Sequence, residues 1–125
     1  MTQQPARDGT PLRITIEGTV LTGNLTDNAT SRSLIDQLPL TLSFTDYGGQ
    51  EMIADLPTPL SLDGMPAGDD ADPLTIGYYA PAQAIVFYYE PVGYFNGIVR
   101  IGTLDDLSMI RDLDSGFTAT LTLAP

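Results

Sequence analysis

The feature that most constrains the fold of this chain is a succession of short apolar segments separated by turn residues. Alternation of apolar and polar residues is typical of a half-buried strand. It predicts strands near residues 12–20, 19–26, 40–44, 51–56, 75–79, 84–90, 98–104 and 117–123. Only one segment has a convincing helical pattern, and one helix cannot cover both faces of a parallel sheet. The sequence therefore predicts a mainly β protein, either a closed barrel or a sandwich.

The convincing helical pattern spans about residues 28–38. Asn28 or its neighbour Asp27 can accept hydrogen bonds from the first free backbone N–H groups of a helix. An apolar stripe follows, and Pro39 ends the helix because the residue before a proline disfavours the helical conformation. Because a helix this short is only marginally stable by itself, we expect it to pack against the β structure as a cap. A second, short helical turn is expected at about residues 105–110.

The pattern indicates a single domain. Residues 1–11 have no periodicity and are expected to form a frayed tail, and residues 12–125 form the domain. A chain of this length buries roughly two-thirds of the surface that its unfolded form exposes. Residues 60–73 contain several glycines, prolines and aspartates and are expected to be a loop, and residues 91–97 are expected to be a turn.

The net charge is −11, from sixteen acidic residues against five arginines, with no lysine or histidine. Phosphate backbones and anionic lipid surfaces repel such a chain, so nucleic acids and membranes are not expected partners. No apolar run approaches the ~20 residues needed to cross a bilayer. The N-terminus lacks a basic region followed by an apolar one, so we expect a soluble, cytoplasmic protein. A domain processed from a longer precursor would have the same sequence features.

Two absent residue types exclude several kinds of chemistry. Without cysteine or histidine the chain has no thiolate nucleophile, no Ser-His or Cys-His pair and no preferred zinc ligand. We therefore expect no metal and no cofactor. The aspartates of the 60–73 loop could suggest calcium, but their spacing does not match an EF-hand, and a solvated turn is favoured. Arg100 alternates with apolar neighbours and is expected to point outward to an acidic residue.

Three segments carry a resemblance to a known family: LPLTLSFTDYGGQE, IGYYAPAQAIVFYYE and GIVRIG. In this order they resemble the bacterial cyclophilin-like family of small proteins of unknown function. The resemblance covers most of the chain, from about Leu12 to Leu123. It implies a closed, eight-stranded antiparallel barrel capped by helices. One departure is the inserted sequence DADPLTI before Gly77-Tyr78, which leaves the conformation of the 60–75 loop open.

The wider relatives implied by this resemblance are the cyclophilin prolyl isomerases. Phe87-Tyr88 is similar to their paired-aromatic strand, and Asn96-Gly97 to the turn before their next strand. Those enzymes place an arginine on the strand after the first helix, whereas the matching stretch, Leu38 to Phe44, contains none. The histidine and tryptophan of their proline pocket are also missing. The resemblance therefore implies the barrel but gives no catalytic residue, and we do not expect an enzyme of that type.

The aromatic residues carry the main functional signal, since seven of the ten lie between Tyr78 and Phe95. The strand from Ile85 to Tyr89 is apolar on both faces, which a barrel wall covered only from inside does not require. At least one tyrosine of each adjacent pair should therefore lie outside the core, where clustered aromatics commonly mark a recognition site. The residues predicted to line a binding groove are Tyr47, Tyr79, Phe87, Tyr88, Tyr94 and Phe95. The competing interpretation is that the helix or the 60–73 loop covers these side chains.

Three functions remain open from the sequence. The first is a binding module that holds a peptide or a small apolar ligand without covalent chemistry. The second is a degenerate prolyl isomerase. The third is a homodimer that uses the aromatic face as its contact, because the sequence does not determine the oligomeric state.

Overall fold

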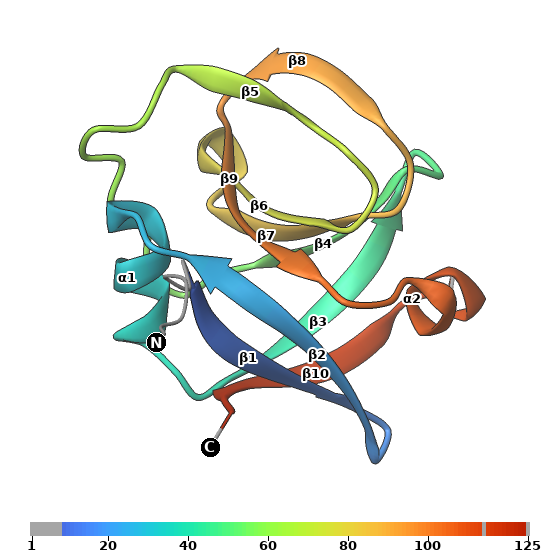
Figure 1. The fold of residues 1–125 in the computed structure, drawn as a ribbon. Helices are drawn as coiled ribbons and strands as arrows, with labels where there is room; N and C mark the ends of the chain where they lie inside the picture. The colour runs from blue at the N-terminus through green and yellow to red at the C-terminus, as the bar shows by residue number, and fades with distance from the viewer. Residues whose placement is uncertain (1–8, 114, 125) are drawn as a thin grey trace, which may run out of the picture.

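The computed structural model describes residues 9–113 and 115–124, which form a closed eight-stranded antiparallel barrel and a separate two-stranded ribbon (Figure 1). The barrel order is β1-β10-β3-β4-β7-β6-β9-β2, and β5 pairs with β8 in the ribbon. The strands are β1 (Gly9–Ile16), β2 (Thr19–Thr26), β3 (Leu40–Tyr47), β4 (Glu51–Asp55), β5 (Gly68–Ala71), β6 (Thr75–Tyr79), β7 (Ala84–Tyr88), β8 (Val92–Asn96), β9 (Ile98–Leu104) and β10 (Phe117–Leu123). The helices are α1 (Ala29–Ile35) and α2 (Ser108–Asp112), with a 3-10 turn η1 (Ala80–Ala82) between β6 and β7. The mainly β, closed eight-stranded barrel is confirmed.

Tight turns and long-range pairing close the barrel. Gly48 and Gly49 adopt positive φ angles of 66° and 70°, which joins β3 to β4 by a short hairpin turn. Strand β10, the last of the chain, pairs with both β1 and β3, so the two halves of the wall meet there. The barrel therefore has no free edge, which removes the unpaired backbone groups of an open sheet.

The inward face of each barrel strand forms one continuous apolar core. At its centre the ring of Phe44 stacks on that of Phe87, with centroids 4.5 Å apart, and on that of Phe117, at 5.1 Å. These rings come from β3, β7 and β10, so one stack connects three strands of the wall. Burying a side chain of this size contributes roughly 1.5–3 kcal/mol.

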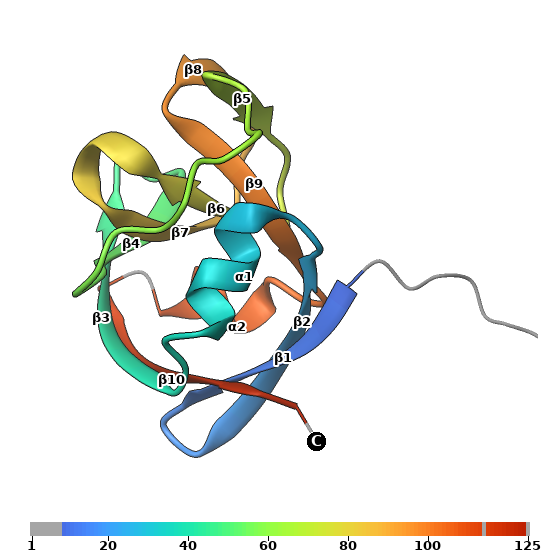
Figure 2. The ribbon, with the colours of Figure 1, turned by 90° about the vertical axis from the view of Figure 1, so that its left-hand side faces the viewer.

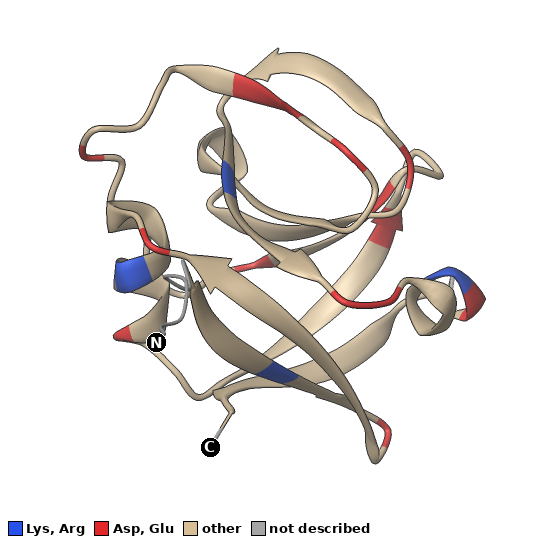
Figure 3. Cartoon of the chain, viewed as in Figure 1, with Lys and Arg blue, Asp and Glu red and all other residues tan. Residues whose placement is uncertain are grey.

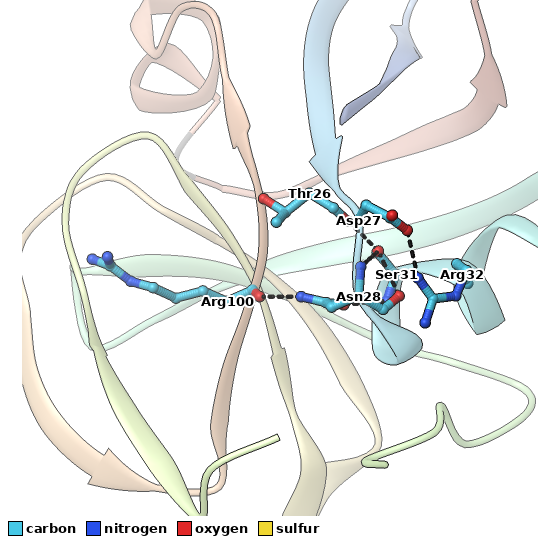
Figure 4. A network of polar contacts seen from close by, with 6 residues as sticks. All are labelled: Thr26, Asp27, Asn28, Ser31, Arg32 and Arg100. Carbon is cyan, nitrogen blue, oxygen red and sulfur yellow. Dashed lines mark hydrogen bonds and ion pairs between the residues drawn. The ribbon is translucent and has the colours of Figure 1, made fainter. Parts of the chain in front are cut away.

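Helices α1 and α2 lie at opposite ends of the barrel (Figures 1 and 2). Asn28 caps α1: its side chain accepts a hydrogen bond from the Ser31 N–H at 2.8 Å, and the Ser31 hydroxyl interacts in return with the Asn28 N–H. The Asn28 amide also donates to the backbone oxygen of Arg100 on β9, which holds the helix against the wall (Figure 4). Leu34 then reaches the core and is fully buried.

Both helices are present, with bounds that differ from those predicted. Helix α1 ends at Ile35 rather than near Leu38. After it, single hydrogen-bonded turns continue the backbone as far as Leu38, just before Pro39. Helix α2 begins at Ser108, whose backbone N–H and hydroxyl both donate hydrogen bonds to the Asp106 carboxylate. The expected helical turn at 105–110 is therefore shifted toward the C-terminus.

Two segments expected to lack strand structure form the ribbon. Strand β5 lies inside the expected 60–73 loop, and β8 lies inside the expected 91–97 turn. Neither segment shows the apolar alternation that marks a strand, since β5 has the sequence GDDA and β8 has the sequence VGYFN. In the structure β8 is exposed along most of its length. Their pairing is therefore a tertiary effect, which corrects the expectation for both segments.

The N-terminal region was expected to be a frayed tail through residue 11. Residues 1–8 lie outside the described residues, but Gly9 already pairs with Thr26 at the start of β1. Pairing with β2 thus extends β1 by three residues before its expected start at Leu12. None of the helices in the described part of the chain is long and apolar enough to cross a bilayer.

Candidate functional site

A pocket of about 420 Å³ lies on the outer wall of the barrel, beside the β5–β8 ribbon. Four aromatic side chains line it, together with Gln50, Glu51 and smaller apolar residues of β4, β8, β9 and η1. These aromatic residues are Tyr47, Tyr79, Tyr88 and Phe95. They come from β3, β6, β7 and β8, so the pocket depends on strands that are distant in sequence.

Strand register places three of the pocket residues in one row. Tyr47 on β3 lies opposite Glu51 on β4, and Glu51 in turn lies opposite Tyr88 on β7. Residues directly opposite each other in antiparallel strands project to the same face, with Cβ atoms only ~4.5–5.5 Å apart. The row therefore presents a carboxylate between two tyrosines on the outer surface of the barrel.

Tyr79 and Phe95 complete the aromatic lining from the other side. Their ring centroids lie 6.0 Å apart with the planes tilted by 44°, a common geometry for interacting aromatic rings. Tyr79 projects outward at the end of β6, while its neighbour Tyr78 is buried in the main core. The expected division of this tyrosine pair between the two sides of the wall is confirmed.

Under the ribbon lies a second apolar cluster, separate from the barrel core. Its buried members are Ala71, Val86, Tyr88 and Ile98, and the partly buried Ile53, Tyr79 and Val92 pack against them. This cluster explains why β7 is apolar on both faces: one face fills the barrel and the other is covered by the ribbon. The ribbon covers part of the outer aromatic face, and the pocket is the part left open beside it.

Arg100 fixes the ribbon to the wall. Its Nε donates to the backbone oxygen of Asp70 at 2.9 Å, and its terminal nitrogen pairs with the Asp72 carboxylate at 2.9 Å. The hydrogen bond with Asp72 is the main reason that the pKa of Arg100 is raised. The side chain points away from α1, as Figure 4 shows, so the expected outward orientation toward an acidic residue is confirmed.

The acidic loop does not assemble a cation site among its described residues. Asp70 and Asp72 face Arg100, and the Asp69 carboxylate accepts a hydrogen bond from the backbone N–H of Asp70. Within residues 9–113 and 115–124, no group of three or more acidic side chains is arranged to hold a metal ion. Asp70 and Asp72 therefore contribute to holding the ribbon against the wall.

Gly77 allows the Tyr88 ring to lie close over β6. A Cβ atom at position 77 would stand 2.7 Å from Cε2 of Tyr88, well inside van der Waals contact. The absence of a side chain at Gly77 thus sets the depth at which Tyr88 sits in the wall. Tyr88 is almost fully buried and forms part of the pocket wall.

The charged residue that lines the pocket is acidic and partly buried. Burial, and secondarily the nearby Asp46, raise the pKa of the Glu51 carboxyl above its ordinary value. Burial also raises the pKa of Tyr88, followed by the effects of Glu51 and Tyr79. Each shift disfavours adding negative charge to this region. Figure 3 shows further acidic residues on the β5 strand of the ribbon.

The structure brings together four of the six residues predicted for the groove and separates two. Phe87 is fully buried inside the barrel against Phe44, because it follows the inward period of β7. This position corrects its expected place in the groove. Tyr94 is 65% exposed on β8, where its hydroxyl hydrogen-bonds Asn96, and it does not line the pocket.

Glu51 and Gln50 line the pocket but are not among the residues predicted from the sequence. The alternation in β4 contains the signal, because Met52 and Ala54 are buried inward and Glu51 and Ile53 must then face outward. Their place beside the aromatic residues depends on the pairing of β4 with β7, which no local pattern specifies.

Comparison with known proteins gives a consistent fold. A family model described as the cyclophilin-like family matches residues 14–122. The solution structure of a hypothetical protein from Archaeoglobus fulgidus is similar, with a TM-score of 0.63 and 19% sequence identity. That alignment covers 98% of this chain and 100% of the archaeal chain. At this identity the likeness concerns the fold alone. A search of curated proteins found no match.

Proposed function

This chain belongs to the cyclophilin-like family, and we propose that it is a binding module that holds a small apolar ligand or an apolar side chain of a peptide in its outer pocket. The observation that carries the proposal is the convergence of Tyr47, Tyr79, Tyr88 and Phe95 on one pocket of about 420 Å³. Ligand pockets usually have volumes of ~300–1,000 Å³, with mostly apolar walls and a few polar groups.

The exposure of the pocket rim supports the proposal. Tyr47 and Phe95 are 64% and 55% exposed, although both are large apolar side chains whose burial would stabilise the protein. Exposed aromatic residues that cluster around a concave surface are typical of recognition sites, where they bury area at low cost in conformational entropy. A ligand seated between them would cover this surface.

The lining favours binding without catalysis. Lowering the ~18–20 kcal/mol barrier to peptide rotation needs a fixed donor aimed at the rotating amide. The lining residues offer tyrosine hydroxyls and Gln50 but no arginine. A protease-coupled assay with an Ala-Pro peptide separates the two functions: the proposal expects the uncatalysed rate, and a rate well above it would establish the isomerase instead.

Two exposed tyrosines provide a matched test by mutation. Tyr47→Ala removes a pocket wall, and Tyr94→Ala removes an equally exposed ring that does not line the pocket. In titrations with proline-containing peptides and small aromatic fragments, followed by amide chemical shifts, Tyr47→Ala should weaken binding by about 5–30-fold. Tyr94→Ala should change it less than about twofold.

Two results would contradict the proposal. Chemical shift changes scattered away from the strands that line the pocket would show that the ligands bind elsewhere. Sedimentation of a dimer that Tyr47→Ala converts to a monomer, without ligand binding to either form, would make the aromatic rim a subunit contact.

A further inference from the structure

The pocket contains one acidic side chain whose charge is not neutralised within the described residues. Glu51 lines the pocket at the centre of the Tyr47–Glu51–Tyr88 row. The ion pairs of the described arginines join Arg32 to Asp27, Arg100 to Asp70 and Asp72, and Arg111 to Glu90. Arg13 lies on β1, which does not border the pocket. Among residues 9–113 and 115–124, Glu51 therefore has no basic partner.

A half-buried carboxylate without a cation is costly, because burial removes part of its hydration. Replacing Glu51 by a neutral residue would remove that cost, so its presence in an otherwise aromatic wall has to be explained. The polar groups around it do not supply the missing charge, since Asp46 is also acidic and Tyr88 stays protonated. A ligand that carries a positive charge would supply it.

The aromatic residues beside Glu51 favour the same kind of ligand. The faces of tyrosine and phenylalanine rings attract cations within ~6 Å of the ring centre, most strongly when water is excluded. An ammonium group beside Glu51 would lie next to the exposed ring of Tyr47, its neighbour in the row. The apolar part of the same molecule would then reach Tyr79 and Phe95 on the other side of the pocket.

The chemistry of the lining favours an organic cation over a metal ion. Hard metal ions require several oxygen ligands, six to eight for calcium, and most pocket walls here are carbon. Ring faces and one carboxylate instead match an alkylammonium group with an apolar body. The net charge of −11 acts in the same direction at long range, because it attracts cations to the protein.

Resting on the function proposed above, we infer that the ligand of this pocket is a small organic cation, with its ammonium group against Glu51 and its apolar part between Tyr79 and Phe95. Glu51 is then the specificity determinant of the pocket, and the aromatic residues supply most of the contact area.

Three probes with one carbon skeleton test the inference. 3-Phenylpropylamine, 3-phenylpropan-1-ol and 3-phenylpropanoate carry a cation, a neutral group and an anion on the same phenylpropyl body. Titrations at pH 7 and low salt, followed by amide shifts, should give the amine at least about tenfold higher affinity than the alcohol. The carboxylate should bind more weakly than the alcohol, since Glu51 repels it.

A matched pair of variants assigns the preference to one side chain. Glu51→Gln removes the pocket charge and should bring the amine within about threefold of the alcohol. Glu17→Gln makes the same change of net charge at the β1–β2 turn, away from the pocket, and should leave the tenfold preference in place. Amide spectra of both variants check that the barrel is intact.

The outcomes separate this inference from the proposed function. Equal binding of amine and alcohol to the wild-type pocket would overturn the organic-cation inference and leave the binding module standing. A preference for the amine that survives in Glu51→Gln would also overturn it, because the charge would then act from elsewhere. If none of the three probes shifts the pocket amides at millimolar concentration, the cation inference fails, and the peptide and fragment titration alone decides the proposed function.

Discussion

At the scale of single residues, the site depends on side chains whose neighbours determine their roles. Tyr88 and Phe87 are adjacent in sequence, yet one lines the outer pocket and the other stacks in the core. The period of a strand determines this division, since successive side chains point to opposite faces. The sequence supplies the alternation, but only the structure shows which face of β7 is inside.

Gly77 provides a test of how Tyr88 is positioned. Gly77→Ala adds a Cβ that would meet the Tyr88 ring at 2.7 Å, so the ring must move toward the pocket. We expect a loss of about 1–3 kcal/mol in the free energy of unfolding, together with weaker ligand binding. Denaturant unfolding measures the first effect and the titration described above measures the second.

Gly93→Ala is the matched control for this substitution. A Cβ at Gly93 meets nothing within 4 Å, and this glycine is not among those with a positive φ angle. Its effect on stability should stay within about 0.5 kcal/mol. Equal effects of the two substitutions would show that contact with Tyr88 is not what requires glycine at position 77.

Glu51 links stability to pH with a sign opposite to that of a salt-bridged acid. Burial and the nearby Asp46 raise the pKa of Glu51 in the folded protein, so ionising this carboxyl group destabilises the folded state relative to the unfolded state. The loss of folding stability caused by the Glu51 charge is absent when the pH lies below the ordinary carboxyl pKa. It grows as the pH rises through the folded pKa and reaches its full size above that value. Asp46 and Tyr88 face the same group, and Tyr88, whose pKa is raised, remains neutral in this range.

Glu51→Gln should therefore raise the melting temperature at pH 7 and leave it nearly unchanged below pH 4. Thermal unfolding of wild type and variant across this range measures the difference. A stabilisation that is equally large at low pH would show that the effect does not come from the carboxylate charge. Combined with weaker binding of the amine, stabilisation at neutral pH would identify Glu51 as a residue retained for binding.

At the scale of secondary structure, the β5–β8 ribbon turns one face of the barrel wall into a pocket. The sequence indicates that β7 requires cover on both faces, but the covering element has no strand pattern of its own. The competing interpretation, that the 60–73 region covers the aromatic residues, holds for part of this face, because β5 lies in that region and its Ala71 packs against Tyr88 and its neighbours. The paired ribbon depends on contacts with residues distant in sequence, which local periodicity does not encode.

Arg100 allows the attachment of the ribbon to be tested separately from the barrel. Arg100→Ala removes the hydrogen bond to Asp70 and the ion pair with Asp72. Because both partners of the ion pair are partly exposed, the expected loss of global stability is only about 0.5–1.5 kcal/mol. Amide hydrogen exchange should accelerate in β5 and β8 and stay slow in the strands of the core.

Arg32→Ala serves as the control, since it removes an exposed ion pair with Asp27 that lies beside α1 (Figure 4). Exchange in the ribbon should be unaffected by that change. Uniformly faster exchange throughout the barrel in Arg100→Ala would contradict a local role for this arginine.

At the scale of the whole molecule, the barrel is more predictable than its site. Strong alternation in the barrel strands, capping at Asn28 and the family resemblance give the architecture and the approximate position of α1. All four aromatic residues of the pocket are among the six predicted from the clustering of aromatic residues in the sequence. Glu51 and the ribbon are not predicted, because both depend on which strands become neighbours when the barrel closes, and that pairing joins residues far apart in the chain.

We propose that molecules bind on the outer wall of this barrel, in the pocket between Tyr47, Tyr79, Tyr88 and Phe95. A map of amide chemical shift changes on saturation with the tightest-binding probe or peptide tests it most directly. We expect changes concentrated at the adjoining ends of β3, β4, β6, β7 and β8, with little change at either helix-capped end of the barrel. Changes centred on α1 or α2, or no saturable change with any probe or peptide, would contradict it.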